Sequence, residues 1–288
     1  MDKVATKKKK YIWIVIILGI VPILVLAFNN RLTIRTYEVT SYKMAEGSSV
    51  RIVLLSDLHS TLFGSDQQPL ISRIVSQNPD IILLAGDIMV DAIPNEPTRL
   101  FLEGIQDIAP IFYVTGNHEY WGTNSDNIHI IRSIIQSYNI KFLSNEFEQV
   151  YIDGNNLIIA GLEDTDKINA VSDYNHIESM QELFESLSDF DDYFKILLTH
   201  RPDNIELYTQ HPFDMVTAGH THGGQVRIPF ILNGLVAPGQ GWFPRFAGGV
   251  YTFNEFTLIV SRGLATQHPR IPRIFNPPEV VVIVLSYP

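Results

Sequence analysis

The chain contains no cysteine among its 288 residues. Disulfide bonds, thiolate metal sites and cysteine nucleophiles are therefore all excluded. The absence does not assign a compartment, since a protein outside the cytoplasm can also lack disulfides. With 45% hydrophobic and 18% charged residues the composition is that of a globular protein, and the length suffices for one large domain or two small ones.

Basic side chains are scarce outside the first ten residues. Those ten hold five lysines and one aspartate, so the rest of the chain has 16 basic and 30 acidic side chains, a net charge of −14. Affinity for the phosphate backbone of nucleic acids depends on clustered lysine and arginine. We therefore expect no nucleic-acid partner.

Charge is also absent from the run 11–28, which directly follows the lysines at 7–10. A helix of this length spans roughly 27 Å, just enough for the hydrocarbon core of a bilayer. Lysines flanking such a segment stay in the cytoplasm, which predicts a single-pass cell-membrane protein with its body outside. A cleaved signal peptide is the alternative, but its apolar part is usually shorter and ends in an A-x-A-like site. Here Ala27 is followed by Phe28, which favours an uncleaved anchor.

These features divide the chain into four parts. Residues 1–10 form a basic cytoplasmic tail, 11–28 a transmembrane anchor, 29–49 a linker and domain entry, and 50–288 one folded domain. The sequence shows no internal repeat. Its oligomeric state is left open.

The folded part alternates between two kinds of apolar pattern. Short apolar runs predict strands within 50–59, 80–87, 109–118, 194–200 and 213–222. Apolar residues at three- and four-residue spacing predict helices within 68–77, 98–107, 127–138 and 178–189. Beyond 225 the pattern changes to strands and loops rich in glycine and proline. The early strand–helix–strand–helix order predicts an α/β fold with a mostly parallel, helix-covered sheet.

Each of the five predicted strands ends in carboxylate, amide or imidazole side chains. In open α/β sheets ligands bind just beyond the carboxyl ends of the strands, so these groups should converge. Residues i and i+2 of an extended chain point the same way, so we expect Asp57 and His59 to hold one ion, and His220 and His222 one or two neighbouring ions. Glycines beside them, as in AGHTHGGQ (218–225), let the backbone turn sharply.

The fragments DLH, GDIMVD, GNHE, LLTH and GHTHGGQ, in this order, resemble the five motifs of the calcineurin-like metallophosphoesterases over about residues 50–225. The stretch 261–285 further resembles the bacterial membrane-associated YkuE-like branch. One departure is that Ala92 follows Asp91, where an arginine is often found. This weakens a structural role for Asp91.

The resemblance implies a four-layer α/β/β/α sandwich of two mixed sheets, with a two-metal site whose ions share an attacking hydroxide. One metal would take Asp57, His59 and His222, the other Asn117, His200 and His220, and Asp87 would bridge the two. Oxygen and nitrogen ligands without sulfur suit two divalent ions of Mn, Fe or Zn. His118 would stay off the metals and protonate the leaving oxygen. Asp91 and Glu119 would orient ligands or water.

The implied function is a membrane-anchored phosphoesterase that hydrolyses a phosphodiester or pyrophosphate bond, with a lipid-linked substrate as one candidate. A phosphomonoesterase or protein phosphatase is the alternative within the same chemistry. A non-catalytic adaptor is disfavoured, because every ligand position and His118 are present.

The aromatic-rich segment 229–249 leaves two alternatives open. It is either a lip that contacts a lipid or the bilayer surface, or a loop whose Trp242, Phe243 and Phe246 pack on the core. Four later arginines could meet a substrate phosphate, although each by itself is expected to be a surface charge. They are Arg245, Arg262, Arg270 and Arg273.

Overall fold

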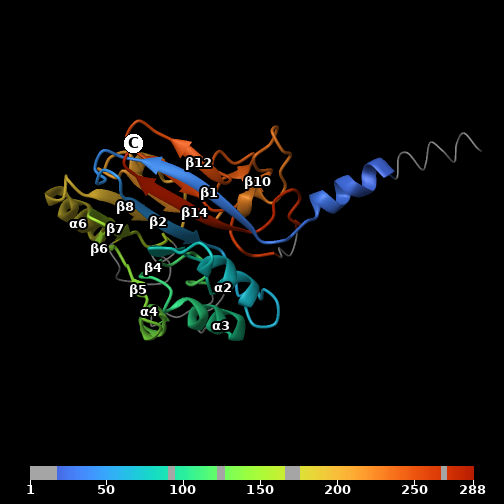
Figure 1. Ribbon diagram of the computed structural model, residues 1–288, viewed down its shortest axis with the longest axis horizontal. Helices are drawn as coiled ribbons and strands as arrows, with labels where there is room; N and C mark the ends of the chain where they lie inside the picture. Colours follow the sequence, from blue (N-terminus) through green and yellow to red (C-terminus); the bar gives the residue numbers. More distant parts are fainter. Residues whose placement is uncertain (1–17, 90–94, 122–126, 166–175, 267–270) are drawn as a thin grey trace, which may run out of the picture.

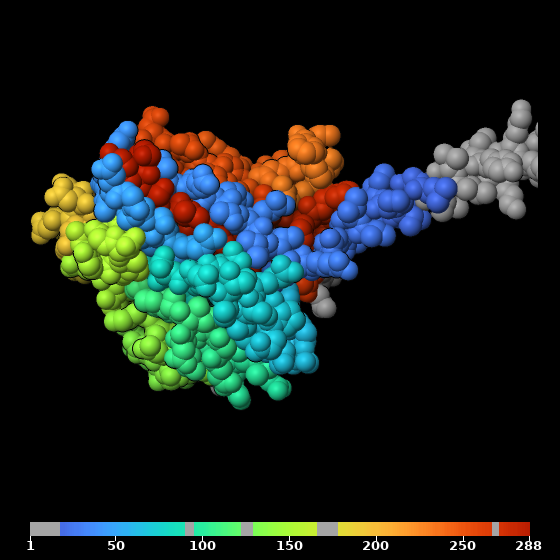
Figure 2. Space-filling view, in the orientation of Figure 1, coloured from blue at the N-terminus to red at the C-terminus, as the bar shows by residue number. Residues whose placement is uncertain are grey.

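The computed structural model describes residues 18–89, 95–121, 127–165, 176–266 and 271–288. Figure 1 shows a body built from two sheets and their helices, and in Figures 1 and 2 the apolar helix formed by residues 18–27 projects from this body. The mixed α/β architecture predicted from the sequence is confirmed.

The first sheet has six strands in the order β1-β14-β2-β3-β4-β5. Their bounds are β1 Thr33–Thr40, β2 Ser49–Leu55, β3 Ile81–Ala85, β4 Ile111–Val114, β5 Lys141–Phe142 and β14 Glu279–Ser286. The pairs from β2 to β5 are parallel, β14 runs antiparallel to β2, and β1 runs parallel to β14. The first and last strands of the domain are therefore neighbours in one sheet.

The second sheet also has six strands, in the order β12-β13-β9-β8-β7-β6. Their bounds are β6 Glu146–Ile152, β7 Asn155–Gly161, β8 Phe194–Leu198, β9 Met215–Ala218, β12 Gly249–Thr252 and β13 Thr257–Val260. The central pairs are parallel and the two edge pairs antiparallel. A separate two-stranded ribbon joins β10 (Val236–Ala237) to β11 (Gly241–Trp242).

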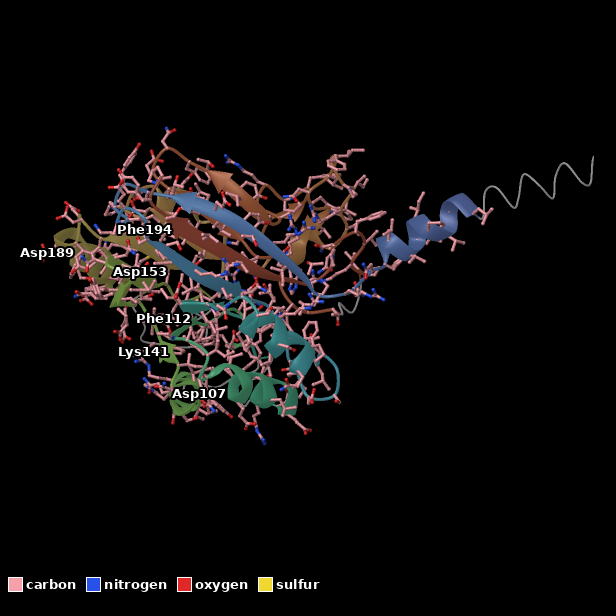
Figure 3. All side chains as sticks on the ribbon, in the orientation of Figure 1. Asp107, Phe112, Lys141, Asp153, Asp189 and Phe194 are labelled. Atoms are coloured by element: carbon pink, nitrogen blue, oxygen red, sulfur yellow. The ribbon has the colours of Figure 1, made fainter. Side chains whose placement is uncertain are left out.

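Alternation along the strands assigns each side chain to a layer, because successive residues of a strand face opposite sides. In β2, Ile52 and Leu54 belong to the core between the two sheets, whereas Val53 and Leu55 face the helices. Phe112 of β4 and Phe194 of β8, labelled in Figure 3, both belong to the core between the sheets. The two sheets thus pack face to face.

Helices cover the outer face of each sheet. The cores on these faces contain residues of α2, α3 and α4 for the first sheet, and of α6 and α7 for the second. The helices are α2 Gln68–Val75, α3 Glu96–Ile105, α4 Asn127–Ser137, α6 His176–Ser186 and α7 Ile205–Tyr208. This is the layering that the resemblance implied.

All five predicted strands and four predicted helices are present, and the strands end earlier than predicted. The run 50–59, for example, is strand only as far as Leu55. The polar residues at the end of each run are therefore in loops or, for His222, in the short 3-10 helix His222–Gly224. The segment 29–49, predicted as a linker and domain entry, also contributes the full strand β1 to the first sheet.

Among the described residues, none of the helices is long and apolar enough to cross a membrane. The predicted anchor at 11–28 lies only partly within them, because residues 1–17 are outside the described part of the chain. The described part, 18–27, is helical. Its large apolar side chains are exposed, among them Leu18, Val25 and Leu26.

Candidate metal centre

The predicted site residues lie in the loops that follow the central strands of both sheets. Asp57, Asp87 and Asn117 follow β2, β3 and β4 of the first sheet, and His200 and His220 follow β8 and β9 of the second. Backbone contacts join the two sets: the His220 N–H donates to the Asp57 carboxylate (3.0 Å to Oδ2). The site therefore forms where the carboxyl ends of strands from both sheets meet.

The expectation that extended chain aims these side chains is wrong. Asp57 and His59 have φ of 51° and 45°, and His220 and His222 have φ of 71° and 49°. Asp87 also adopts this left-handed conformation, at φ 53°. The left-handed conformation is unfavourable for residues with a Cβ. It is found most often at functional sites, where the surrounding structure stabilises it. Tight turns rather than strand alternation thus direct the ligand side chains.

Two glycines allow these loops to approach closely. A Cβ on Gly116 would lie 2.3 Å from Asp87 Oδ1, and one on Gly219 would lie 2.7 Å from Asp57 Oδ2. No side chain fits at such distances, so glycine is required at both positions. The glycines that the sequence places beside the histidine and asparagine motifs serve this contact between loops.

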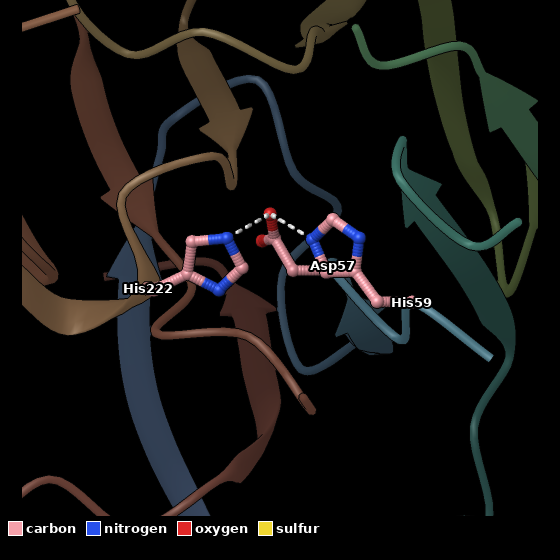
Figure 4. A group of neighbouring side chains, drawn as sticks. All are labelled: Asp57, His59 and His222. Carbon is pink, nitrogen blue, oxygen red and sulfur yellow. Dashed lines mark ion pairs between the residues drawn. The ribbon is translucent and has the colours of Figure 1, made fainter. Parts of the chain in front are cut away.

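One group of potential ligands consists of Asp57, His59 and His222 (Figure 4). The Nε2 atoms of His59 and His222 lie 3.9 and 3.7 Å from Asp57 Oδ1. His59 Nε2 is buried without a hydrogen-bond partner. A buried polar atom aimed at a carboxylate, with no partner of its own, is consistent with a cation position.

A second group surrounds His200 Nε2. Three atoms approach this nitrogen: His220 Nδ1 at 3.0 Å, Asn117 Oδ1 at 3.2 Å and Asp87 Oδ2 at 3.3 Å. The other ring nitrogen, Nδ1, is 2.8 Å from the Ala85 carbonyl oxygen. Such a bond orients the ring and leaves Nε2 facing the site, the usual arrangement of metal-binding histidines.

Asp87 lies between the two groups. Its Oδ2 atom is 3.5 Å from His59 Nε2 as well as 3.3 Å from His200 Nε2. A third group of close ligand atoms consists of His59, Asp87 and His118. Asp87 therefore lies where a bridging residue would lie. His118, which was predicted to stay off the metals, has a ring nitrogen close to the potential ligand atoms of His59 and Asp87.

The charge states suit metal binding. Burial lowers the pKa of His59 to about 4 and that of His222 well below its ordinary value. Both imidazoles are therefore neutral at pH 7, as ligands must be. For His200 burial opposes protonation, but the charge of Asp87 outweighs it and raises the pKa to about 10. The carboxylates therefore favour a positive charge at this point, whether a proton or a metal ion supplies it.

Two residues hold the loops of the site in place. The Glu119 carboxylate accepts three backbone hydrogen bonds, from Asp87 N (2.9 Å), Met89 N (3.1 Å) and Gly116 N (2.8 Å). The Asn276 amide donates to the His222 carbonyl oxygen at 2.7 Å. Glu119 therefore acts on the backbone of the ligand loops, and Asn276 ties the C-terminal segment to them.

A cavity of about 240 Å³ opens over the site and is lined by Arg201 and Trp121 beside the ligands. The Asp164 carboxylate holds the Arg201 guanidinium with two bonds, of 2.7 and 3.0 Å. The Trp121 ring lies 4.0 Å from that of His118. Sequence reasoning missed Arg201, although it directly follows a predicted ligand in the motif LLTHR.

The four arginines considered from the sequence differ in how far they are buried. Arg262 and Arg273 are buried, so neither is a surface charge, and neither lines the cavity over the site; Arg245 is exposed. Arg270 lies outside the described residues, as does Asp91. The aromatic segment 229–249 fits neither alternative throughout. Phe246 is buried, whereas Trp242 and Phe243 are exposed.

A mixed α/β fold and clustered His and Asp residues at strand ends define a candidate metallohydrolase. The family model for calcineurin-like phosphoesterases matches residues 50–224, and the chain belongs to this family. The resemblance inferred from the five motifs is thereby confirmed. The chain is a metallophosphoesterase, a hydrolase of phosphoric esters.

Three relatives cover most of the chain. An uncharacterized metallophosphoesterase of Campylobacter jejuni is 32% identical, over 90% of this chain and 66% of its own length. The UDP-2,3-diacylglucosamine pyrophosphatase LpxG of Chlamydia trachomatis is 28% identical, over 92% of this chain and 94% of its own. The uncharacterized metallophosphoesterase YkuE of Bacillus subtilis is 27% identical, over 82% and 79%.

Proposed function

We propose that the protein is a dinuclear metal-dependent phosphoesterase, anchored in the cell membrane, that hydrolyses a phosphodiester or pyrophosphate bond of a lipid-linked substrate. The observation that carries the proposal is the convergence of three groups of ligand atoms, in which His59 links the first group to the third and Asp87 links the third to the second. Two divalent ions held there would stabilise charge on the phosphate oxygens and activate water.

The residues of the chain supply binding and proton transfer. His118 is half-buried beside the ligands, with its ring 4.4 Å from that of His59, and from there its imidazole can donate a proton to the leaving oxygen. The Arg201 guanidinium lines the same cavity and can bind a phosphate oxygen. Because Asp164 fixes that guanidinium, the phosphate would be held in one orientation.

The lipid-linked substrate and the membrane are supported by two separate observations. One relative that matches nearly the whole chain is named a UDP-2,3-diacylglucosamine pyrophosphatase, so its name describes a pyrophosphate attached to a diacylated sugar. The uncharged run at 11–28, preceded by lysines, supports an anchor with the catalytic body outside the cytoplasm.

The metal site is tested with Asp87→Asn. The full chain is purified in detergent, stripped with a chelator and reloaded separately with Mn, Fe or Zn. Asp87→Asn should lose metal and nearly all activity while its circular dichroism is unchanged. The exposed substitution Glu148→Gln serves as the control. Two ions per chain retained by Asp87→Asn in elemental analysis would show that the assigned site is wrong.

The bond is tested with three substrates for the same reloaded enzyme. These are bis(p-nitrophenyl) phosphate, p-nitrophenyl phosphate, and a lipid-bearing sugar attached to a nucleoside diphosphate. We expect the diester and the pyrophosphate to be hydrolysed faster than the monoester. The reverse order would identify a phosphomonoesterase.

The location is tested with protease added to spheroplasts. If the run at 11–28 crosses the membrane once, protease should digest the body and leave cytoplasmic markers intact. A body protected from protease would reverse the orientation. A soluble mature chain that begins near Phe28 would identify a cleaved signal peptide instead.

A further inference from the structure

The segment 228–243, here called the apolar lobe, places five large apolar side chains on the surface, of which Ile228 is the least exposed, at 46%. Phe230 is 109% exposed, Ile231 82%, and Trp242 and Phe243 68% each. Large apolar side chains gathered on a surface usually mark an interaction site. Phe246, three residues beyond Phe243, is only 5% exposed, so the apolar lobe is not simply a poorly packed part of the core.

The apolar lobe and the end of the apolar N-terminal helix are tied to the same short segment. Phe275 N donates to the Ala27 carbonyl at 2.7 Å, and the N–H of Arg227, the residue directly before the lobe, donates to the Ile274 carbonyl at 2.9 Å. Figure 2 shows the lobe, in orange, and the helix, in blue, at the same end of the molecule. Both elements with exposed apolar side chains therefore lie at one end of the molecule.

The apolar lobe also forms a wall of the metal centre. Pro238 and Gly239 line the cavity over the site, and a Cβ on Gly239 would lie 3.6 Å from His220 Nε2. Phe243 N donates to the Leu235 carbonyl, and Leu235 N to the Gly224 carbonyl next to the ligand loop. A surface that covered the lobe would therefore lie beside the opening of the site.

Charge indicates which surface that is. The chain has a net charge of −10, yet Glu255 is the one acidic residue in the sequence between Asp214 and Glu279. The apolar lobe is flanked by Arg227 and Arg245. Exposed apolar side chains flanked by arginine suit a bilayer that contains anionic lipids.

We propose that the apolar lobe docks on the surface of an anionic lipid bilayer, inserts Phe230, Ile231, Trp242 and Phe243 between the headgroups, and opens the metal centre towards them. The enzyme would then take its phosphoester from the membrane surface, a consequence that rests on the proposed function. The docking itself depends only on the lobe and the lipid.

The docking is tested by tryptophan fluorescence, because the chain has three tryptophans and one of them is in the lobe. Trp13→Phe and Trp121→Phe leave Trp242 as the single emitter in the full chain. The chain is reconstituted in vesicles of phosphatidylcholine and phosphatidylglycerol, with and without bromine on the acyl chains. We expect brominated lipid to quench Trp242, and quenching to weaken when phosphatidylglycerol is omitted.

The matched control places the emitter at the other end of the body. Tyr151 is exposed at the end of β6, near Asp153, which Figure 3 labels opposite the N-terminal helix. Tyr151→Trp in a chain with Trp13, Trp121 and Trp242 all changed to Phe should not be quenched. Trp242 emission unaffected by brominated lipid would overturn the proposal, as would emission that responds only to protein concentration, which would indicate a second copy on the lobe.

A second measurement separates docking from chemistry. Phe230→Ser with Ile231→Ser should lower hydrolysis of a vesicle-borne substrate by about tenfold or more, because burial of a large apolar side chain contributes at least that much to binding. Hydrolysis of bis(p-nitrophenyl) phosphate in detergent should be unchanged. Equal rates on vesicles for variant and wild type would contradict the docking. Failure of the wild type on every phosphoester would contradict the proposed function alone, since the quenching is measured without turnover.

Discussion

A buried ion pair between the two sheets provides a quantitative test of the structure. Arg262 follows β13 of the second sheet, and Glu279 begins β14 of the first. The Arg262 guanidinium donates to Glu279 Oε2 at 2.8 Å, and the Arg262 backbone N–H donates to Oε1 at 3.0 Å. Burial opposes the charge on Arg262, but Glu279 raises its pKa above the ordinary value. Arg262 is therefore charged at neutral pH.

The perturbation is Glu279→Gln, which leaves the arginine charge buried without its carboxylate. Removing one partner of a buried pair destabilises a protein by about 3–5 kcal/mol, because the remaining charge stays desolvated. For a folded body of this size, a loss of 1 kcal/mol in the free energy of unfolding lowers the melting temperature by about 2–4 °C. We therefore expect the melting temperature of Glu279→Gln to fall by about 6–20 °C.

The effect should reach the metal centre. Gly263, next to Arg262, packs on Asp57, where a Cβ would lie 2.8 Å from the Asp57 Cβ. Glu279 N also donates to the Gly263 carbonyl at 3.3 Å. A weakened pair should therefore loosen the loop behind this ligand, and metal affinity should fall together with the melting temperature.

The assay is thermal unfolding of the full chain in detergent, followed by near-ultraviolet circular dichroism. Glu148→Gln is the control, because it breaks an exposed pair with Lys141 that is expected to contribute about 1 kcal/mol or less. Adding Arg262→Met to Glu279→Gln removes the unpaired charge and should restore most of the stability. Equal melting temperatures for Glu279→Gln and Glu148→Gln would refute the reasoning.

Three further predictions concern the metal centre and its cavity. His118→Asn should keep its metal but lose rate by a factor on the order of 10²–10⁴ for an alkoxide leaving group, and by less for p-nitrophenolate, which needs little protonation. Arg201→Lys loses the two-bond contact with Asp164, so KM should rise more than kcat falls in steady-state kinetics. Gly116→Ala would place a Cβ 2.3 Å from Asp87 Oδ1 and should lower metal content in elemental analysis.

Each of these predictions has a result that contradicts it. Equal losses of His118→Asn on good and poor leaving groups would exclude proton donation. For Arg201→Lys, a fall in kcat alone would show that the guanidinium does not bind substrate in the ground state. Full metal content in Gly116→Ala would mean that the loops can separate without cost; Gly19→Ala, at a helical position where a Cβ would meet nothing within 4 Å, is its matched control.

The order of strands and helices could be predicted from the sequence because local periodicity encodes it. Buried runs such as 52–55 and 81–85 are apolar throughout since both faces of these strands are covered, and amphipathic spacing identified α2 and α3. The polar residues after those runs were recognisable by type and by their fixed order. This much required no knowledge of contacts distant in sequence.

Only the tertiary structure determined which residues far apart in the chain contact each other. Asp57 and His220 meet because the ends of β2 and β9, from different sheets, face each other, and left-handed turns rather than extended chain aim their side chains. The same holds for Arg262, which the sequence presents as one more surface arginine. It is buried because Glu279, 17 residues away and on the other sheet, offers a carboxylate. The local pattern of apolar residues predicts whether a segment is buried, whereas the packing of the two sheets determines which residues become its partners.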